Sequence, residues 1–98
     1  MNRDLAEYQN KLREVLPALG EKYGVESLAI FGSHIHGTQR AESDLDILVT
    51  FFKTPSLIRL IEIENSLTDL LRIKVDLVPR SALKPHIGAQ ILREIVPV

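Results

Sequence analysis

Apolar residues recur along the chain with helical and strand-like patterns in turn, and these patterns predict the secondary structure. From Asp4 to Tyr23 apolar residues lie three or four positions apart, which predicts an amphipathic helix. Pro17 cannot donate a backbone hydrogen bond to the preceding turn, so we expect a kink or a short break around Leu16. Gly24 is then a suitable C-terminal stop for this helical region.

Three short apolar runs have the length and the flanking turn residues typical of strands. They cover Val25 to Phe31, Asp44 to Phe52 and Ile73 to Val78. Between the second and third runs, apolar residues carry the helical period from Leu57 to about Arg72. Ser56 precedes this stretch, and serine is a favourable residue for capping the start of a helix.

Two further segments complete the predicted pattern. We expect a short helical or turn segment from Ser33 to about Ala41. A last helix should begin near Pro85, because proline is favourable in a first helical turn, and Pro97 should end it. The apolar residues that we expect this helix to bury are Ile87, Ile91, Leu92 and Ile95. Helices and strands thus alternate in an α/β pattern, and residues 1–98 form one domain.

The lengths of the connections predict how the strands pair. Only the eleven residues 33–43 separate Gly32, which ends the first apolar run, from Asp44 at the start of the second, whereas a parallel crossover usually needs a dozen or more. The first two strands should therefore be antiparallel. The second and third are joined by a long helical link, so they can pair in parallel through a right-handed crossover. The expected fold is a small mixed three-stranded sheet flanked by helices.

This topology gathers three carboxylates at one rim of the sheet. Asp44 and Asp46 share a strand face because side chains alternate between faces, and Asp76 should lie at a comparable height. Either Asp44 or Asp46 alone could simply satisfy backbone donors at the start of a strand. When the three carboxylates lie together, each close pair of them repels by about 4 kcal/mol at an effective dielectric constant of ~20. Lys74, on the same strand face as Asp76, is one possible partner.

A hard divalent cation is the economical compensation for such a cluster. Mg²⁺ prefers a few carboxylate oxygens together with water and phosphate oxygens, and two ions about 4 Å apart can activate an attacking oxygen and stabilise a leaving one. We therefore predict that Asp44 and Asp46 bridge two Mg²⁺ ions. Asp76 would hold the second ion and help to deprotonate an acceptor hydroxyl.

The Gly32–Ser33 pair at the end of the first strand completes the predicted site. Gly32 permits a sharp exit from the strand and a close approach of the backbone. The N–H groups that open the following segment, together with the Ser33 hydroxyl, can bind a phosphate. A nucleoside triphosphate would then extend from this turn to the metal ions.

The composition limits which partners, metal sites and cellular locations are expected for this chain. The chain has 12 basic and 13 acidic residues and a formal charge of -1, so direct nucleic-acid binding is not predicted. It has no cysteine, and therefore neither a disulfide framework nor a thiolate zinc site. No apolar run approaches the roughly 20 residues that span a membrane, and the first residues lack the apolar core of a signal peptide. We expect a cytoplasmic protein.

One combined motif resembles the minimal nucleotidyltransferase (MNT) family of the DNA-polymerase-β-like superfamily. It consists of Gly32–Ser33, ten intervening residues, Asp44-x-Asp46, and then Asp76 in a hydrophobic strand. With the opening and closing helices, the likeness covers nearly the whole chain. Family members commonly act as antitoxins beside a HEPN-domain ribonuclease toxin. The resemblance implies that this chain transfers AMP from Mg-ATP to a tyrosine of a partner HEPN toxin and silences it.

The motif differs from the family pattern at one position. Members often carry arginine immediately before the second glycine, where this chain has His36 before Gly37. Arginine is permanently charged, whereas histidine is only partly charged at neutral pH. We assign His36 to the nucleotide site. If it replaces that arginine, activity should fall as the pH rises above about 7.

Two other functions are compatible with the same residues. The first is a non-catalytic antitoxin that binds nucleotide or metal and neutralises its partner by covering it. The second is a small-molecule nucleotidyltransferase subunit that a helical partner completes. Only about twenty residues follow Asp76, so we expect another chain to supply most of the acceptor recognition. This favours a protein acceptor and a hetero-oligomer.

Overall fold

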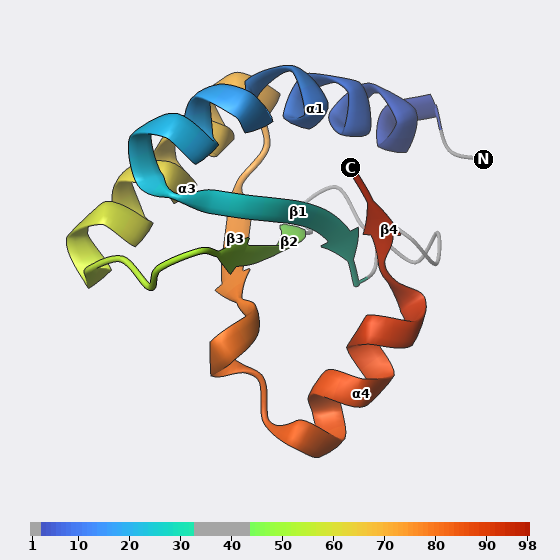
Figure 1. The fold of residues 1–98 in the computed structure, drawn as a ribbon. Helices are drawn as coiled ribbons and strands as arrows, with labels where there is room; N and C mark the ends of the chain where they lie inside the picture. The colour runs from blue at the N-terminus through green and yellow to red at the C-terminus, as the bar shows by residue number, and fades with distance from the viewer. Residues whose placement is uncertain (1–2, 33–43) are drawn as a thin grey trace.

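The computed structural model describes residues 3–32 and 44–98, and Figure 1 shows a mixed α/β fold, as predicted. The helices are α1 (Arg3–Tyr23), α3 (Leu57–Leu71) and α4 (Pro85–Glu94), with a short 3₁₀ turn η1 (Arg80–Ala82). The strands are β1 (Val25–Phe31), β2 (Leu45–Phe51), β3 (Val75–Pro79) and β4 (Val96–Pro97). The short helical or turn segment predicted from Ser33 to Ala41 lies outside the described residues.

Helix α1 runs without interruption through Pro17, so the short break considered near Leu16 does not occur. Pro17 has no N–H group, so the carbonyl of Arg13, four residues earlier, has no hydrogen-bond donor within the helix. Both residues lie on the exposed side of the helix. That carbonyl can therefore bond to water. Leu12 and Leu19, on either side of the proline in sequence, are both buried, which holds the two halves of the helix on the same core.

The sheet has the strand order β3-β2-β1-β4. Strand β1 pairs antiparallel with β2, and β3 pairs parallel with β2, which confirms both predicted directions. The fourth strand was not predicted. It pairs antiparallel with β1 through Ala29–Pro97 and Ile30–Val96, and a two-residue strand is too short to show any period in the sequence. Its proline is tolerated because β4 is an edge strand.

The hydrophobic core lies between the sheet and the two helices α1 and α3, which cover the same face (Figure 1). Alternate residues of β2 point into this core, and Leu45, Ile47 and Val49 are completely buried. Asp44 and Asp46 alternate with these residues and therefore belong to the opposite face. The predicted helix start is confirmed, since Ser56 caps α3 by accepting a hydrogen bond from the Arg59 N–H at 3.3 Å.

Helix α3 also closes the outer edge of β3. The Val75 N–H donates to Thr68 Oγ1 at 3.1 Å, and the Leu77 N–H donates to Glu64 Oε2 at 2.9 Å. An edge strand otherwise presents unpaired backbone donors. These two side chains satisfy the donors on either side of Asp76 and hold that part of β3 in place.

Helix α4 begins at Pro85 as predicted, but the expected burial of its apolar side is wrong. Ile91, Leu92 and Ile95 are only partly buried, and the Ile87 side chain is not described. In Figure 1 this helix lies across the sheet from α1 and α3, so its apolar side does not join the main core. No helix in the described part of the chain is long and apolar enough to cross a membrane.

Candidate active site

Asp46 and Asp76 lie side by side on neighbouring strands. Their Cα atoms are register partners in the parallel β2–β3 pair, and Asp46 is also the partner of Phe31 on β1. Register partners direct their side chains to the same face of a sheet. Asp46 is partly buried and Asp76 is exposed. The fold thus brings one carboxylate from each of two strands to the face that α1 and α3 leave uncovered.

Asp44 lies at the entrance to β2 and pairs with a lysine. The Lys74 Nζ is 3.9 Å from Asp44 Oδ2, and the two side chains are 78% and 39% exposed. The backbones are joined next to this pair, since the Leu45 N–H donates to the Lys74 carbonyl at 2.8 Å. The sequence indicates Lys74 only as one possible partner of the acids. The signal was present, because Lys74 precedes Asp76 by two residues just as Asp44 precedes Asp46.

Gly32 meets the Asp46 side chain at the end of β1. Its φ of +86° is in the left-handed region, where residues with a Cβ are strained. A Cβ at this position would also lie 3.1 Å from Asp46 Cγ and would collide with the carboxylate oxygen Oδ2. Glycine is therefore required here twice, for the turn and for the position of an acid. Ser33 and His36, the other two residues predicted to bind nucleotide, lie outside the described residues.

The acids fit the chemistry of a magnesium site more than that of a closed metal cage. Within residues 3–32 and 44–98, no three side chains of His, Cys, Asp or Glu converge closely enough to hold an ion together. Mg²⁺ in phosphate-transferring sites typically takes one or two carboxylates and fills its remaining positions with water and phosphate oxygens. The neighbouring carboxylates of Asp46 and Asp76 supply such a donor set.

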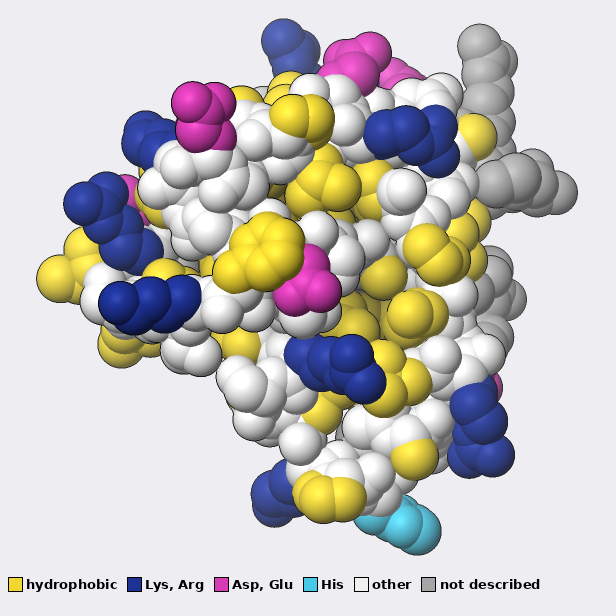
Figure 2. Space-filling model, viewed as in Figure 1, with side chains coloured by type: hydrophobic (Ala, Val, Ile, Leu, Met, Phe, Trp, Pro, Cys, Tyr) yellow, Lys and Arg dark blue, Asp and Glu magenta, His cyan; other side chains and the backbone are white. Residues whose placement is uncertain are grey.

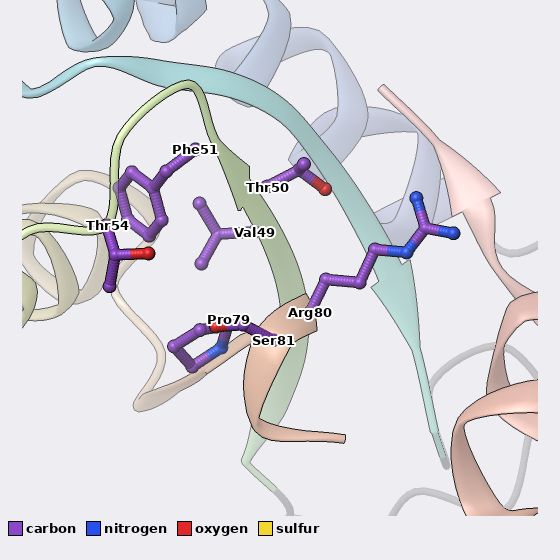
Figure 3. Close-up of a pocket in the computed structure, with 7 residues that line it drawn as sticks. All are labelled: Val49, Thr50, Phe51, Thr54, Pro79, Arg80 and Ser81. Atoms are coloured by element: carbon purple, nitrogen blue, oxygen red, sulfur yellow. The ribbon is translucent and has the colours of Figure 1, made fainter. Parts of the chain in front are cut away.

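A cavity of about 370 Å³ lies at the other end of the same strands. Figure 3 shows the side chains of Phe51, Thr54 and Pro79 around it, while the Arg80 guanidinium extends away from them. The remaining lining residues are Val49, Thr50 and Ser81. Of the described residues that were predicted to form the site, Gly32, Asp44, Asp46 and Asp76, none lines this cavity. In Figure 2, Lys and Arg side chains are scattered among uncharged ones over the visible face, with no single basic patch.

Comparisons with known proteins agree on one family. The protein adenylyltransferase MntA of Thermococcus cleftensis is 43% identical over 94 residues, which cover 96% of this chain and 95% of that protein. A crystal structure of a toxin–antitoxin complex with AMP-PNP contains a chain that is 27% identical, with a TM-score of 0.76, covering 91% of this chain and 70% of that one.

A third comparison concerns the fold alone. A complex of a tri-AMPylated Shewanella oneidensis HEPN toxin with its MNT antitoxin contains a chain that superposes with a TM-score of 0.70 at 22% identity, covering 94% of this chain and 69% of that one. The family model described as "Nucleotidyltransferase domain" matches residues 12–98. With this match over most of its length, and the acids arranged as above, the chain belongs to the nucleotidyltransferase domain family.

Proposed function

We propose that residues 1–98 act as a minimal nucleotidyltransferase that transfers AMP from Mg-ATP to a tyrosine hydroxyl of a partner HEPN toxin, and so serves as an antitoxin in the cytoplasm. The observation that carries this proposal is the pairing of Asp46 with Asp76 in neighbouring strands, with Gly32 packed against Asp46. A strand pair that presents acids beside a glycine turn provides carboxylates for metal and backbone for phosphate at one rim.

The chemistry is a displacement at the α-phosphorus of ATP. The acceptor oxygen forms a bond to this phosphorus, the bond to the bridging oxygen of the β-phosphate breaks, and pyrophosphate leaves. Asp76 would help to take the proton that the hydroxyl loses. Magnesium held by Asp44, Asp46 and Asp76 would supply charge stabilisation for the phosphate oxygens. Gly32 and Ser33 would bind the phosphate chain through backbone N–H groups, with His36 as a further contact.

Two features support a protein as the acceptor. Asp76 is exposed and Asp46 partly so, which suits a hydroxyl presented on the surface of another protein. Four large apolar side chains are also exposed along the β2–α3 connection and the start of α3: Phe52 at 75%, Leu57 and Ile58 at 71%, and Ile61 at 46%. Several large exposed apolar side chains in one stretch of chain are compatible with a protein interaction surface. The relatives named as a protein adenylyltransferase and as a toxin–antitoxin complex support the same conclusion.

The test is transfer of label from ATP. The protein is incubated with Mg²⁺, ATP labelled on the α-phosphate and the HEPN toxin encoded beside it. The wild-type protein should label the toxin on tyrosine, as mass spectrometry can verify, while Asp44→Asn and Asp46→Asn should not. Asp69→Asn is the matched control, because Asp69 is an exposed acid on α3 in the layer away from the site.

Two outcomes would replace the proposal. Neutralisation of the toxin that survives both Asn substitutions, with no label on the toxin, would favour a non-catalytic antitoxin that acts by binding. Label that appears on a small molecule and requires a helical partner would favour the subunit of a small-molecule nucleotidyltransferase. The small-molecule alternative uses the same acids, so the destination of the label separates it from the proposed function. The non-catalytic alternative is separated by the absence of label.

A further inference from the structure

The parallel pairing of β2 and β3 places charged side chains opposite one another at two neighbouring positions. Both positions lie on the face of the sheet that α1 and α3 leave uncovered. One position holds two acids, because Asp46 is the register partner of Asp76. The preceding position on that face holds an acid and a base, because Asp44 forms an ion pair with Lys74. A cation next to the start of β3 thus lies beside one of the acids that are proposed to bind magnesium.

The geometry of Lys74 combines a fixed backbone with an exchangeable ammonium group. Its carbonyl accepts the Leu45 N–H at 2.8 Å, which ties its backbone to the start of β2. Its side chain is 78% exposed, and the ammonium lies 3.9 Å from the Asp44 carboxylate. Exposed ion pairs of this length contribute little to stability. The pair is therefore poorly explained as a stabilising contact, and it can be exchanged for another at small cost.

The charge of Lys74 has opposite effects on a free metal ion and on a metal–nucleotide complex. A divalent cation that approaches Asp44 is repelled by the ammonium group, which lies 3.9 Å from the carboxylate. A triphosphate brings several anionic oxygens, and lysine is an effective point-charge partner for phosphate. When metal and triphosphate arrive together, the ammonium can leave Asp44 for a phosphate oxygen while the metal takes its place at the carboxylate.

We propose that Lys74 is an internal counter-ion that makes the site select the metal–nucleotide complex over the free metal ion. In the nucleotide-free protein it pairs with Asp44 and lowers the affinity for Mg²⁺. On binding of Mg-ATP it exchanges Asp44 for a phosphate oxygen. The second half of this proposal rests on the proposed function, since it takes a nucleoside triphosphate as the substrate. The first half concerns free metal only and can be tested separately.

The first measurement is the affinity for free Mn²⁺, a paramagnetic substitute for Mg²⁺, by electron paramagnetic resonance without nucleotide. Lys74→Met should bind Mn²⁺ about three- to tenfold more tightly than the wild-type protein, because a repelling charge is removed. Lys74→Arg keeps the charge and should remain close to wild type. Lys11→Met is the matched control, because Lys11 is also paired with a carboxylate, that of Glu7 at 3.4 Å, but lies on α1.

The second measurement is the affinity for Mg-AMP-PNP by calorimetry with the same variants. Lys74→Met should bind it about three- to tenfold more weakly, so the substitution should move the two affinities in opposite directions. Thermal unfolding of each variant checks that all remain folded. Mn²⁺ affinity that is unchanged or weaker in Lys74→Met would overturn the counter-ion role. Weaker Mg-AMP-PNP binding alone would leave Lys74 as a phosphate contact and would also overturn the exchange.

The two proposals fail in different ways. If Lys74→Met tightens Mn²⁺ binding but the wild-type protein transfers no label to the toxin, the counter-ion stands and the adenylyltransferase function fails. If label is transferred and depends on Asp44 and Asp46, while Lys74→Met binds Mn²⁺ as the wild-type protein does, the function stands and the counter-ion role fails.

Discussion

The two ends of the β2–β3 pair are built from the same strands but suit different tasks. At the end where both strands begin, Asp46 lies beside Asp76 on the face that α1 and α3 leave uncovered, and Asp44 is paired with Lys74. At the end where both strands finish, mostly apolar and hydroxyl side chains line a cavity of about 370 Å³. The acids, and not the cavity, mark the candidate site, because metal and phosphate are bound through a few oxygens and need little apolar wall.

The largest expected difference between the two ends is in catalysis. Asp46→Asn should lower the rate of AMP transfer by about a thousandfold or more. It removes a carboxylate charge that would hold the metal ion, and the metal ion would stabilise the transition state by several kcal/mol. Thr54→Val at the cavity end removes one exposed hydroxyl and should leave the rate within about twofold. Steady-state kinetics of toxin labelling measure both. Equal losses from the two substitutions would place the cavity in the catalytic machinery.

The next comparison is between two glycines of similar conformation. Gly32 has a φ of +86° and Gly24 a φ of +74°, but an added Cβ meets Asp46 at Gly32 and nothing within 4 Å at Gly24. Alanine at either position should cost about 1–2 kcal/mol of stability from the left-handed backbone. Only Gly32→Ala should also lose activity, by about a hundredfold, because it displaces an acid.

We would measure denaturant unfolding and toxin labelling on both glycine variants. The two measurements distinguish the strain of the left-handed backbone from the collision of an added Cβ with Asp46. If Gly24→Ala lost as much activity as Gly32→Ala, backbone strain and not the contact with Asp46 would be responsible.

A smaller effect is expected where α3 holds β3. Glu64→Ala leaves the partly buried Leu77 N–H without its 2.9 Å acceptor and should destabilise the protein by about 1–2 kcal/mol. Because Leu77 follows Asp76, we also expect a loss of activity of a few fold. Glu7→Ala is the control, since Glu7 pairs with Lys11 at 3.4 Å on the exposed surface of α1 and should cost at most about 0.5 kcal/mol. Urea unfolding distinguishes the two, and equal costs would contradict the edge-closing role of Glu64.

The smallest effect should come from the cap of α3, beyond the cavity end. Ser56→Ala removes the hydrogen bond from the Arg59 N–H and should cost about 1 kcal/mol of stability. The rate of AMP transfer should stay unchanged, because the cap lies in the layer that covers the core face. Thermal unfolding and the labelling assay test the two statements, and a substantial loss of rate would mean that α3 contributes directly to catalysis.

Much of the fold could be predicted because its signals are local. The run from Val25 to Phe31 has the length of a buried strand and is β1 with the same bounds. Ser56 before a helical period predicts the start of α3. The directions of pairing follow from connection lengths, because a short link cannot form a parallel crossover whereas a long helical one can. These signals act over one element or one connection and can be read without knowing what packs against it.

The errors share a different cause. Continuity through Pro17 depends on burial of Leu12 and Leu19 against the same core, and the pairing of β4 depends on where β1 leaves its free edge. The partial burial of Ile91 depends on α4 lying away from the main core. Each depends on contacts between residues distant in sequence, which periodicity does not report.

For the candidate site, the sequence alone determined which acids share a face, because side chains alternate along a strand, and which glycine could end β1. Only the tertiary structure decided that Asp46 faces Asp76, that Gly32 rests against Asp46, and that Lys74 pairs with Asp44. The physical reason is register, since a shift of one residue between β2 and β3 would turn these neighbours to opposite faces. Register is set by the packing of the whole core and not by either strand alone.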